Sequence, residues 1–147
     1  MSPSTERSTE CSVTFRAATA GTYSVEVSGD GYSVGSYSGT LVVVPDDHGD
    51  TPGTATGVTL GLSRASNLEF IGDVDYFSMT LVAGGAYTAS TTGISTTITV
   101  YDPSLGQVGS AGYNSRAFTA TTAGTYYIKV SGYSSSSTGA YSFVLIQ

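Results

Sequence analysis

Apolar and polar residues alternate over short stretches along most of the chain, and this period of two predicts β-strands. In the stretch TYYIKVS, Tyr126, Ile128 and Val130 occupy every second position. Successive side chains of a strand point to opposite faces of a sheet, so these three are predicted to enter a core. The residues between them, predicted to face solvent, are Tyr127, Lys129 and Ser131.

The same alternation predicts nine short strands after residue 55, separated by Gly, Ser or Asn, with no stretch of helical period. This pattern is typical of an all-β protein, and we expect an antiparallel β-sandwich with jelly-roll-like connections. The predicted strands are residues 56–62, 67–71, 76–81, 86–91, 96–101, 107–110, 116–121, 125–131 and 141–146.

One stretch of 15 residues occurs twice. FRAATAGTYSVEVSG at residues 15–29 returns as FTATTAGTYYIKVSG at residues 118–132, with ten of the fifteen aligned positions identical. The second copy closes a strand-rich region of about 100 residues, whereas only 14 residues precede the first copy. Residues 13–44 are therefore predicted to be the C-terminal half of a preceding repeat, with strands at 13–18, 22–28 and 39–44; this segment is called the half repeat below.

The half repeat needs a partner surface, because three strands cannot cover both faces of a core. That surface is either the chain's own sandwich, extended by added strands, or another chain whose exposed edge accepts them. In the second case, strand complementation would join copies of the chain into a filament, a surface layer or a virion. The candidate assembly residues are Val25, Val27, Leu41, Val42, Val43 and Val44.

Two regions lack the alternating pattern. Residues 1–12 are polar and are predicted to form a flexible leader, and residues 45–55 contain PDDHGDTPG and are predicted to form an acidic linker. The complete sandwich is then expected over residues 56–147. Cys11 is the only cysteine, so no disulfide can form within the chain.

Charge and hydropathy exclude two classes of partner. The chain has 5 basic and 11 acidic residues, for a net charge of -6, and therefore lacks the basic surface that a nucleic acid requires. No apolar run approaches the roughly 20 residues of a membrane helix, so no membrane insertion is expected.

Residues 46–147 resemble the bacterial pre-peptidase C-terminal domain. The motifs that carry the resemblance are DDHGDTPGTAT, IGDVDYFSMTLVAGGAYTAS, ITVYDPSLGQVG and FTATTAGTYYIKVSG followed by TGAYSFVLI, in this order. The family is a β-sandwich appended to secreted proteases and surface proteins, and it is related to the collagen-binding domain of clostridial collagenases. The resemblance implies an extracellular or cell-surface location, and the half repeat resembles the family's final strands a second time.

Acidic residues gather around the start of the sandwich. Asp73 and Asp75 share the parity of Phe77, so two carboxylates lie side by side and need a cation, hydrogen bonds or solvent. Hard oxygen ligands of this kind suit Ca²⁺. In the collagenase relative an acidic linker folds back onto strand carboxylates around calcium, which here implies the set Asp46, Asp47, Asp50, Asp73 and Asp75. The alternative is that the linker aspartates are solvated, while Asp73 and Asp75 cap turns.

Catalysis is not predicted. His48 is the only histidine and is expected to be a solvated linker residue, the alternative being a metal ligand or a general base. Although Ser, His and Asp all occur, no motif places them together in a site, so the chain is not expected to be an enzyme.

Eleven tyrosines invite a binding interpretation. Tyr23, Tyr76, Tyr126 and Tyr141 lie in strand motifs and are expected in the core or at its corners. The outward or loop tyrosines are candidates for a surface that binds protein fibres or a glycan polymer: Tyr32, Tyr113, Tyr127 and Tyr133.

Two functions follow from these observations. The first is a non-catalytic accessory module of an exported protein, which binds calcium and aids secretion, stability or polymer binding. The second is a structural subunit that assembles with copies of itself through the half repeat.

Overall fold

The computed structural model describes residues 11–147 except residues 18, 30, 32 and 33. The chain divides into two compact units, Met1–Ser38 and Gly39–Gln147. Residues 1–10 of the predicted leader lie outside the described residues, and so does Tyr32. The second unit begins within the half repeat, six residues before the expected acidic linker.

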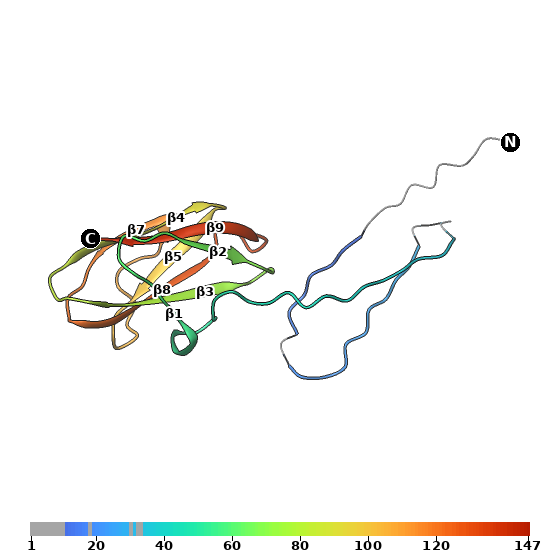
Figure 1. Cartoon of the computed structure of the whole chain (residues 1–147), viewed down its shortest axis with the longest axis horizontal. Helices are drawn as coiled ribbons and strands as arrows, with labels where there is room; N and C mark the ends of the chain where they lie inside the picture. The colour runs from blue at the N-terminus through green and yellow to red at the C-terminus, as the bar shows by residue number, and fades with distance from the viewer. Residues whose placement is uncertain (1–10, 18, 30, 32–33) are drawn as a thin grey trace. The chain divides into compact units, whose positions relative to one another are not determined.

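The second unit is an all-β domain with a single short helical turn among its residues (Figure 1). Its elements are η1 (Pro52–Thr54), β1 (Thr56–Gly57), β2 (Arg64–Leu68), β3 (Val74–Leu81), β4 (Ala86–Gly93), β5 (Thr96–Tyr101), β6 (Gly112–Tyr113), β7 (Ser115–Thr119), β8 (Gly124–Gly132) and β9 (Gly139–Ile146).

These strands form two sheets that face each other, which confirms the predicted β-sandwich (Figure 1). One sheet has the order β1-β3-β8-β5-β6, and the other has the order β2-β9-β4-β7. All pairings are antiparallel except that of β1 with β3. The two C-terminal strands are interior strands: β8 lies between β3 and β5, and β9 lies between β2 and β4.

The core lies between the sheets and follows the predicted alternation. Tyr126, Ile128 and Val130 of β8 are fully buried, and Phe77 of β3 stacks on Phe143 of β9 with ring centroids 4.2 Å apart. Phe77 and Phe143 belong to different sheets, so this aromatic pair joins the two layers. The other buried apolar residues are Leu68, Leu81, Tyr87, Ala89, Ile98, Val100, Phe118, Ala120, Tyr141 and Leu145.

The segment predicted as a strand at residues 107–110 is different in the structure. The carboxylate of Asp102 accepts hydrogen bonds from the backbone N–H groups of Ser104 and Gly106, which turns the chain directly after β5. Leu105, in this turn, has a φ of 64°. Gln107 forms only an isolated bridge with Tyr101, and the edge strand is instead β6.

The strands predicted within the half repeat do not form. None of the described residues from Cys11 to Pro45 is assigned to a β-strand. Val25 and Val27, two of the candidate assembly residues, are 62% and 58% exposed. Residues 41–44 are also exposed. An extended segment becomes a strand only when a neighbouring strand bonds its backbone N–H and C=O groups, and these residues have no such ladder in the structure.

No helix among the described residues has the length and apolar character needed to cross a lipid bilayer.

Candidate metal site at the start of the sandwich

The acidic segment, residues 46–50, packs onto the sandwich instead of running free as a linker. The backbone N–H of Tyr76 in β3 donates a hydrogen bond to the carbonyl of Gly49 at 3.1 Å. The N–H of Asn67 in β2 donates to the carboxylate of Asp47 at 3.0 Å. One contact is made with each sheet, so the segment is fixed at the end of the sandwich where β3 begins.

His48 anchors this segment, and the expectation of a solvated histidine is wrong. The residue is only 4% exposed. Its Nδ1 hydrogen-bonds with Oγ1 of Thr56 at 2.9 Å, and its Nε2 hydrogen-bonds with Oγ of Ser66 at 3.0 Å. The ring also packs edge-on against Phe77, with centroids 4.7 Å apart. Burial lowers the pKa of His48, which favours the neutral imidazole that these two hydroxyl partners satisfy.

Docking of the acidic segment brings carboxylates from distant parts of the chain together. Oxygen atoms of Asp46, Asp47 and Asp75 lie within 4.8 Å of one another, and oxygens of Asp46, Glu69 and Asp73 do the same. Asp46 belongs to both groups and connects them. Asp50 belongs to neither group, and Glu69 was absent from the set that the sequence suggested.

Asp73 is a turn cap, as the alternative interpretation of the sequence proposed. One carboxylate oxygen accepts a hydrogen bond from the N–H of Glu69 at 2.7 Å, and the other accepts one from the N–H of Val74 at 2.8 Å. These bonds fix the loop between β2 and β3. They also hold the Glu69 side chain beside the Asp73 carboxylate, because the cap fixes the backbone of Glu69.

Asp75 has a different environment. The side chain is fully buried, and one carboxylate oxygen accepts a hydrogen bond from the phenol of Tyr141. The other oxygen, Oδ1, has no hydrogen-bond partner. Burial raises the pKa of Asp75 to about 8. A buried carboxylate with an unpaired oxygen is costly unless a proton or a cation neutralises it.

Glu69, next to Asp73, also has a buried carboxylate oxygen without a hydrogen-bond partner. Its Oε1 accepts a hydrogen bond from the side-chain amide of Asn67 at 3.1 Å, and its buried Oε2 has no partner. Burial, followed by the neighbouring carboxyl group of Asp73, raises the pKa of Glu69 to about 7. Each of the two carboxylate groups therefore contains one buried oxygen that lacks a partner. This donor set fits a hard cation such as Ca²⁺, which is bound by oxygen ligands.

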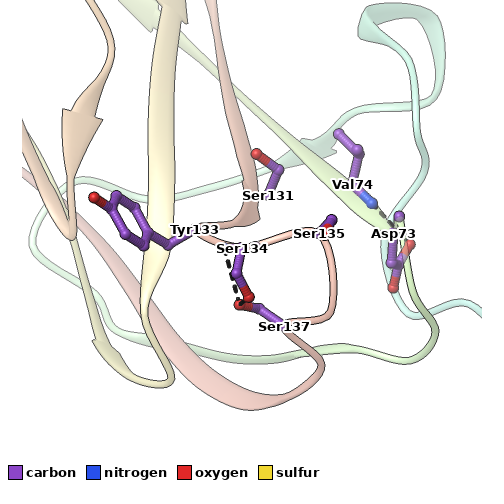
Figure 2. Close-up of a pocket in the computed structure, with 9 residues that line it drawn as sticks. Asp73, Val74, Ser131, Tyr133, Ser134, Ser135 and Ser137 are labelled. Carbon is purple, nitrogen blue, oxygen red and sulfur yellow. Dashed lines mark hydrogen bonds between the residues drawn. The ribbon is translucent and has the colours of Figure 1, made fainter.

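A pocket of about 170 Å³, which Asp73 also lines, lies between the start of β3 and the loop that joins β8 to β9 (Figure 2). Four of its nine lining residues are serines, and Oγ of Ser134 and Oγ of Ser137 lie 2.8 Å apart. The lining contains no histidine, lysine or cysteine that could activate a nucleophile. Its lining residues are Gly72, Asp73, Val74, Ser131, Gly132, Tyr133, Ser134, Ser135 and Ser137.

The candidate ligand tyrosines are only partly brought together. Tyr113 and Tyr133 are 56% and 63% exposed, and their rings pack edge to face with centroids 4.7 Å apart. Tyr127 is half-buried on β8, opposite Tyr101 of β5. Tyr76 was expected in the core, but its parity places it on the outer face, where its ring stacks on Tyr101 at 6.2 Å. Tyr126 and Tyr141 are buried as expected, whereas Tyr23 is exposed.

Comparison with known proteins gives the sandwich its class. The pre-peptidase C-terminal domain of the collagenase from Bacillus anthracis is similar to 66% of this chain over 99% of that domain, with a TM-score of 0.50 and 20% sequence identity. PliG, a periplasmic inhibitor of g-type lysozyme from Aeromonas hydrophila, is similar to 63% of this chain over 94% of its own, with a TM-score of 0.49 and 16% identity. No family model and no curated protein matches the chain. The sandwich has the fold of the pre-peptidase C-terminal domain, which confirms the resemblance seen in the sequence.

Proposed function

We propose that the chain is a non-catalytic β-sandwich module of an exported or cell-surface protein, and that Ca²⁺ bound at the acidic segment stabilises it. Asp46 would be the shared ligand, with Asp47 and Asp75 on one side and Glu69 and Asp73 on the other. The observation that carries the proposal is the pair of buried, unpartnered oxygens on Asp75 and Glu69, one in each group around Asp46.

Calcium would supply the positive charge that these carboxylates lack. With the cation bound, Asp75 and Glu69 would be ionised, and the acidic segment would be attached to the sandwich by ligand bonds in addition to its present hydrogen bonds. The chain between the half repeat and the sandwich would then have a calcium-dependent rigidity. Sites of this kind in extracellular modules bind with dissociation constants on the order of 10⁻⁴–10⁻³ M.

Isothermal titration of the full-length, chelator-treated chain with CaCl₂ tests the proposal. We expect saturable binding that weakens by about tenfold or more in Asp46→Asn, because this residue belongs to both carboxylate groups. Asp102→Asn is the matched control, since Asp102 only caps its own turn. Equal heats for all three proteins, or no binding at millimolar calcium, would contradict the calcium site.

Polymer binding is the proposed role of the outer face of the sandwich. Tyr113 and Tyr133 form an exposed aromatic pair at one edge of the five-stranded sheet, and Tyr76, Tyr101 and Tyr127 lie on the outer face of the same sheet. Aromatic side chains on a rigid sheet offer a large contact area to a protein fibre or a polysaccharide. Such binding would serve an accessory module that holds its parent protein on a polymeric substrate.

A second candidate function is assembly through the half repeat. The observation in its favour is that Val25, Val27 and residues 41–44 all have exposed apolar side chains. Strand complementation would cover these side chains with a neighbouring chain and join copies of the protein. Light scattering during gel filtration over a concentration series tests this candidate: growth of the molar mass with concentration supports it, and a constant monomer mass contradicts self-assembly.

A further inference from the structure

The first copy of the repeated stretch has the same tyrosine corner as the second copy, although none of its described residues forms a strand. The phenol of Tyr23 donates a hydrogen bond to the carbonyl of Thr19 at 2.9 Å, and the phenol of Tyr126 donates to the carbonyl of Thr122 at 3.1 Å. The aligned tyrosines therefore close the same corner four residues upstream. Residues 19–23 therefore have the bend that precedes β8, although none of the described residues of the first copy belongs to a strand.

The aromatic contact next to this corner is also repeated. Phe15 packs on Tyr23 with ring centroids 5.6 Å apart, and Phe118 packs on Tyr126 with centroids 5.9 Å apart. In the sandwich, Phe118 and Tyr126 are buried. The same pair is exposed in the first copy, and so is Ala17, the counterpart of buried Ala120.

The second copy shows what covers these side chains when the fold is complete. β8 pairs with β3 on one side and with β5 on the other, and β7 pairs with β4. β3, β4 and β5 are consecutive in the chain, from Val74 to Tyr101. One continuous segment, β3 to β5, therefore provides both strands that pair with β8 and the strand that pairs with β7.

The apolar side chains of the first copy have nearly the same size as those of the second copy that pack beside β3, β4 and β5. Ile128 and Val130 are fully buried in the second copy. Their counterparts in the first copy are Val25 and Val27. Val27 is identical to its counterpart, and Val25 is smaller than Ile128 by one methylene group. Volume changes of this size are tolerated in protein cores at small cost.

We infer that residues 15–29 bind a polypeptide segment equivalent to β3, β4 and β5, taken from a sandwich half that lacks its own β7 and β8. The inference rests on the proposal that the half repeat pairs with another polypeptide, and it names the kind of partner. A complete second copy is a poorer partner, because its own β8 already occupies the place between β3 and β5. Its free edges are β1 and β6, of two residues each, and β2 and β7, of five residues each. An edge can bond one strand but cannot cover an inward row of side chains.

The experiment mixes the full-length ¹⁵N-labelled chain with an unlabelled polypeptide of residues 46–113, which contains β1–β6 and lacks β7–β9. We expect one-to-one binding in which the amide signals of Tyr23, Val25 and Val27 move to dispersed positions typical of β-structure. A covalent version joins residues 46–113 by a flexible linker to the start of the full-length chain, and we expect it to show a second cooperative unfolding transition.

Val25→Asp combined with Val27→Asp is the test variant, since buried carboxylates would oppose closure of the new core. We expect it to weaken binding by about tenfold or more and to remove the second transition. Ser24→Asp combined with Ser28→Asp is the matched control, because these neighbours have the outward parity and should leave binding unchanged. The sandwich itself should melt identically in both variants, which separates an effect on the half repeat from one on the second unit.

Three results would overturn the inference. If the fragment moves the amides of residues 118–132 instead of 15–29, it exchanges with the sandwich and does not complete the half repeat. If the molar mass of the chain alone increases with concentration, and Val25→Asp combined with Val27→Asp abolishes this increase, the partner is a complete second copy. Only the assembly proposal then stands. If the chain stays monomeric and residues 15–29 do not respond in either format, both fail.

Discussion

The phenol of Tyr141 in β9 donates a hydrogen bond to the buried carboxylate of Asp75 in β3, and this bond connects the two sheets of the sandwich. The bond lies next to the stacked pair Phe77 and Phe143, two residues further along each strand. The proposed calcium site is therefore attached to the core by a polar contact as well as by the strand that carries Asp75.

Removal of this contact should destabilise the sandwich. In Tyr141→Phe, Asp75 loses its one hydrogen-bond donor, and we expect the free energy of unfolding to fall by about 1–3 kcal/mol. Urea denaturation of the chelator-treated chain measures the change. Tyr127→Phe, on the outer face of β8, is the control and should change stability little. Equal stability of the two variants would mean that the Asp75 contact contributes nothing to the fold.

The stability of the calcium-free chain should fall as the pH rises. Burial raises the pKa of Asp75 from an ordinary 3.8 to about 8, and that of Glu69 from 4.5 to about 7. A group with a raised pKa in the folded state contributes stability that is fully present below the unfolded-state value and is lost as the pH approaches the folded-state value. The melting temperature in chelator should therefore decrease between about pH 4 and about pH 8, and Asp75→Asn should flatten this decrease.

Calcium should reverse that trend. Binding requires ionised carboxylates, so the affinity for calcium should increase over the same pH range in which the calcium-free protein weakens. The rise in melting temperature caused by CaCl₂ should be larger near about pH 8 than near about pH 5. MgCl₂ at equal concentration tests for a general salt effect. An equal rise with both salts, independent of pH, would contradict binding at Asp75 and Glu69.

His48 should hold the acidic segment on the sandwich. His48→Ala removes two hydrogen bonds and the contact with Phe77, and we expect a loss of about 2 kcal/mol or more in unfolding free energy. Amide hydrogen exchange locates the effect, because the N–H of Tyr76 bonds to Gly49 and should lose protection. The amides of β8 are the internal control. Unchanged protection at Tyr76 would show that the segment is held by other contacts.

Tyr113 and Tyr133, the exposed aromatic pair, should be required for polymer binding. We expect Tyr113→Ala combined with Tyr133→Ala to reduce retention on collagen fibres or on an insoluble polysaccharide such as chitin by roughly tenfold or more. Tyr37→Ala removes an exposed tyrosine of the first unit and is the control. A sedimentation assay measures the bound fraction. Equal retention of both variants would exclude the pair as the binding surface.

Much of the fold could be predicted from the sequence, because a strand that is buried on one face has apolar residues at every second position. β5 has the bounds predicted for it, and the inward residues of β8 are the predicted ones. Gln107 and its neighbours did not follow the prediction because the Asp102 turn competes with strand formation, and alternation does not report turns. The first copy was predicted as strands from the same signal, but strand formation also requires a partner that the pattern does not contain.

The candidate site was harder to predict because it depends on contacts between distant residues. Asp73 and Asp75 could be predicted as neighbours from their parity, since both lie at the start of one strand. Glu69 is held at the site by the Asp73 cap on its backbone, and His48 is buried by contacts with Thr56, Ser66 and Phe77, which are 8 to 29 residues further along the chain. A short polar run with one histidine has no local feature that distinguishes an anchored segment from a solvated one.

The position of β9 has a consequence for how the protein is made. β2 and β4 are not neighbours, and Gly139–Ile146 must enter between them to complete the four-stranded sheet. During synthesis the amino-terminal strands emerge first, and they cannot complete the four-stranded sheet on their own. The second unit therefore cannot complete its fold until its last strand, β9, has been synthesised.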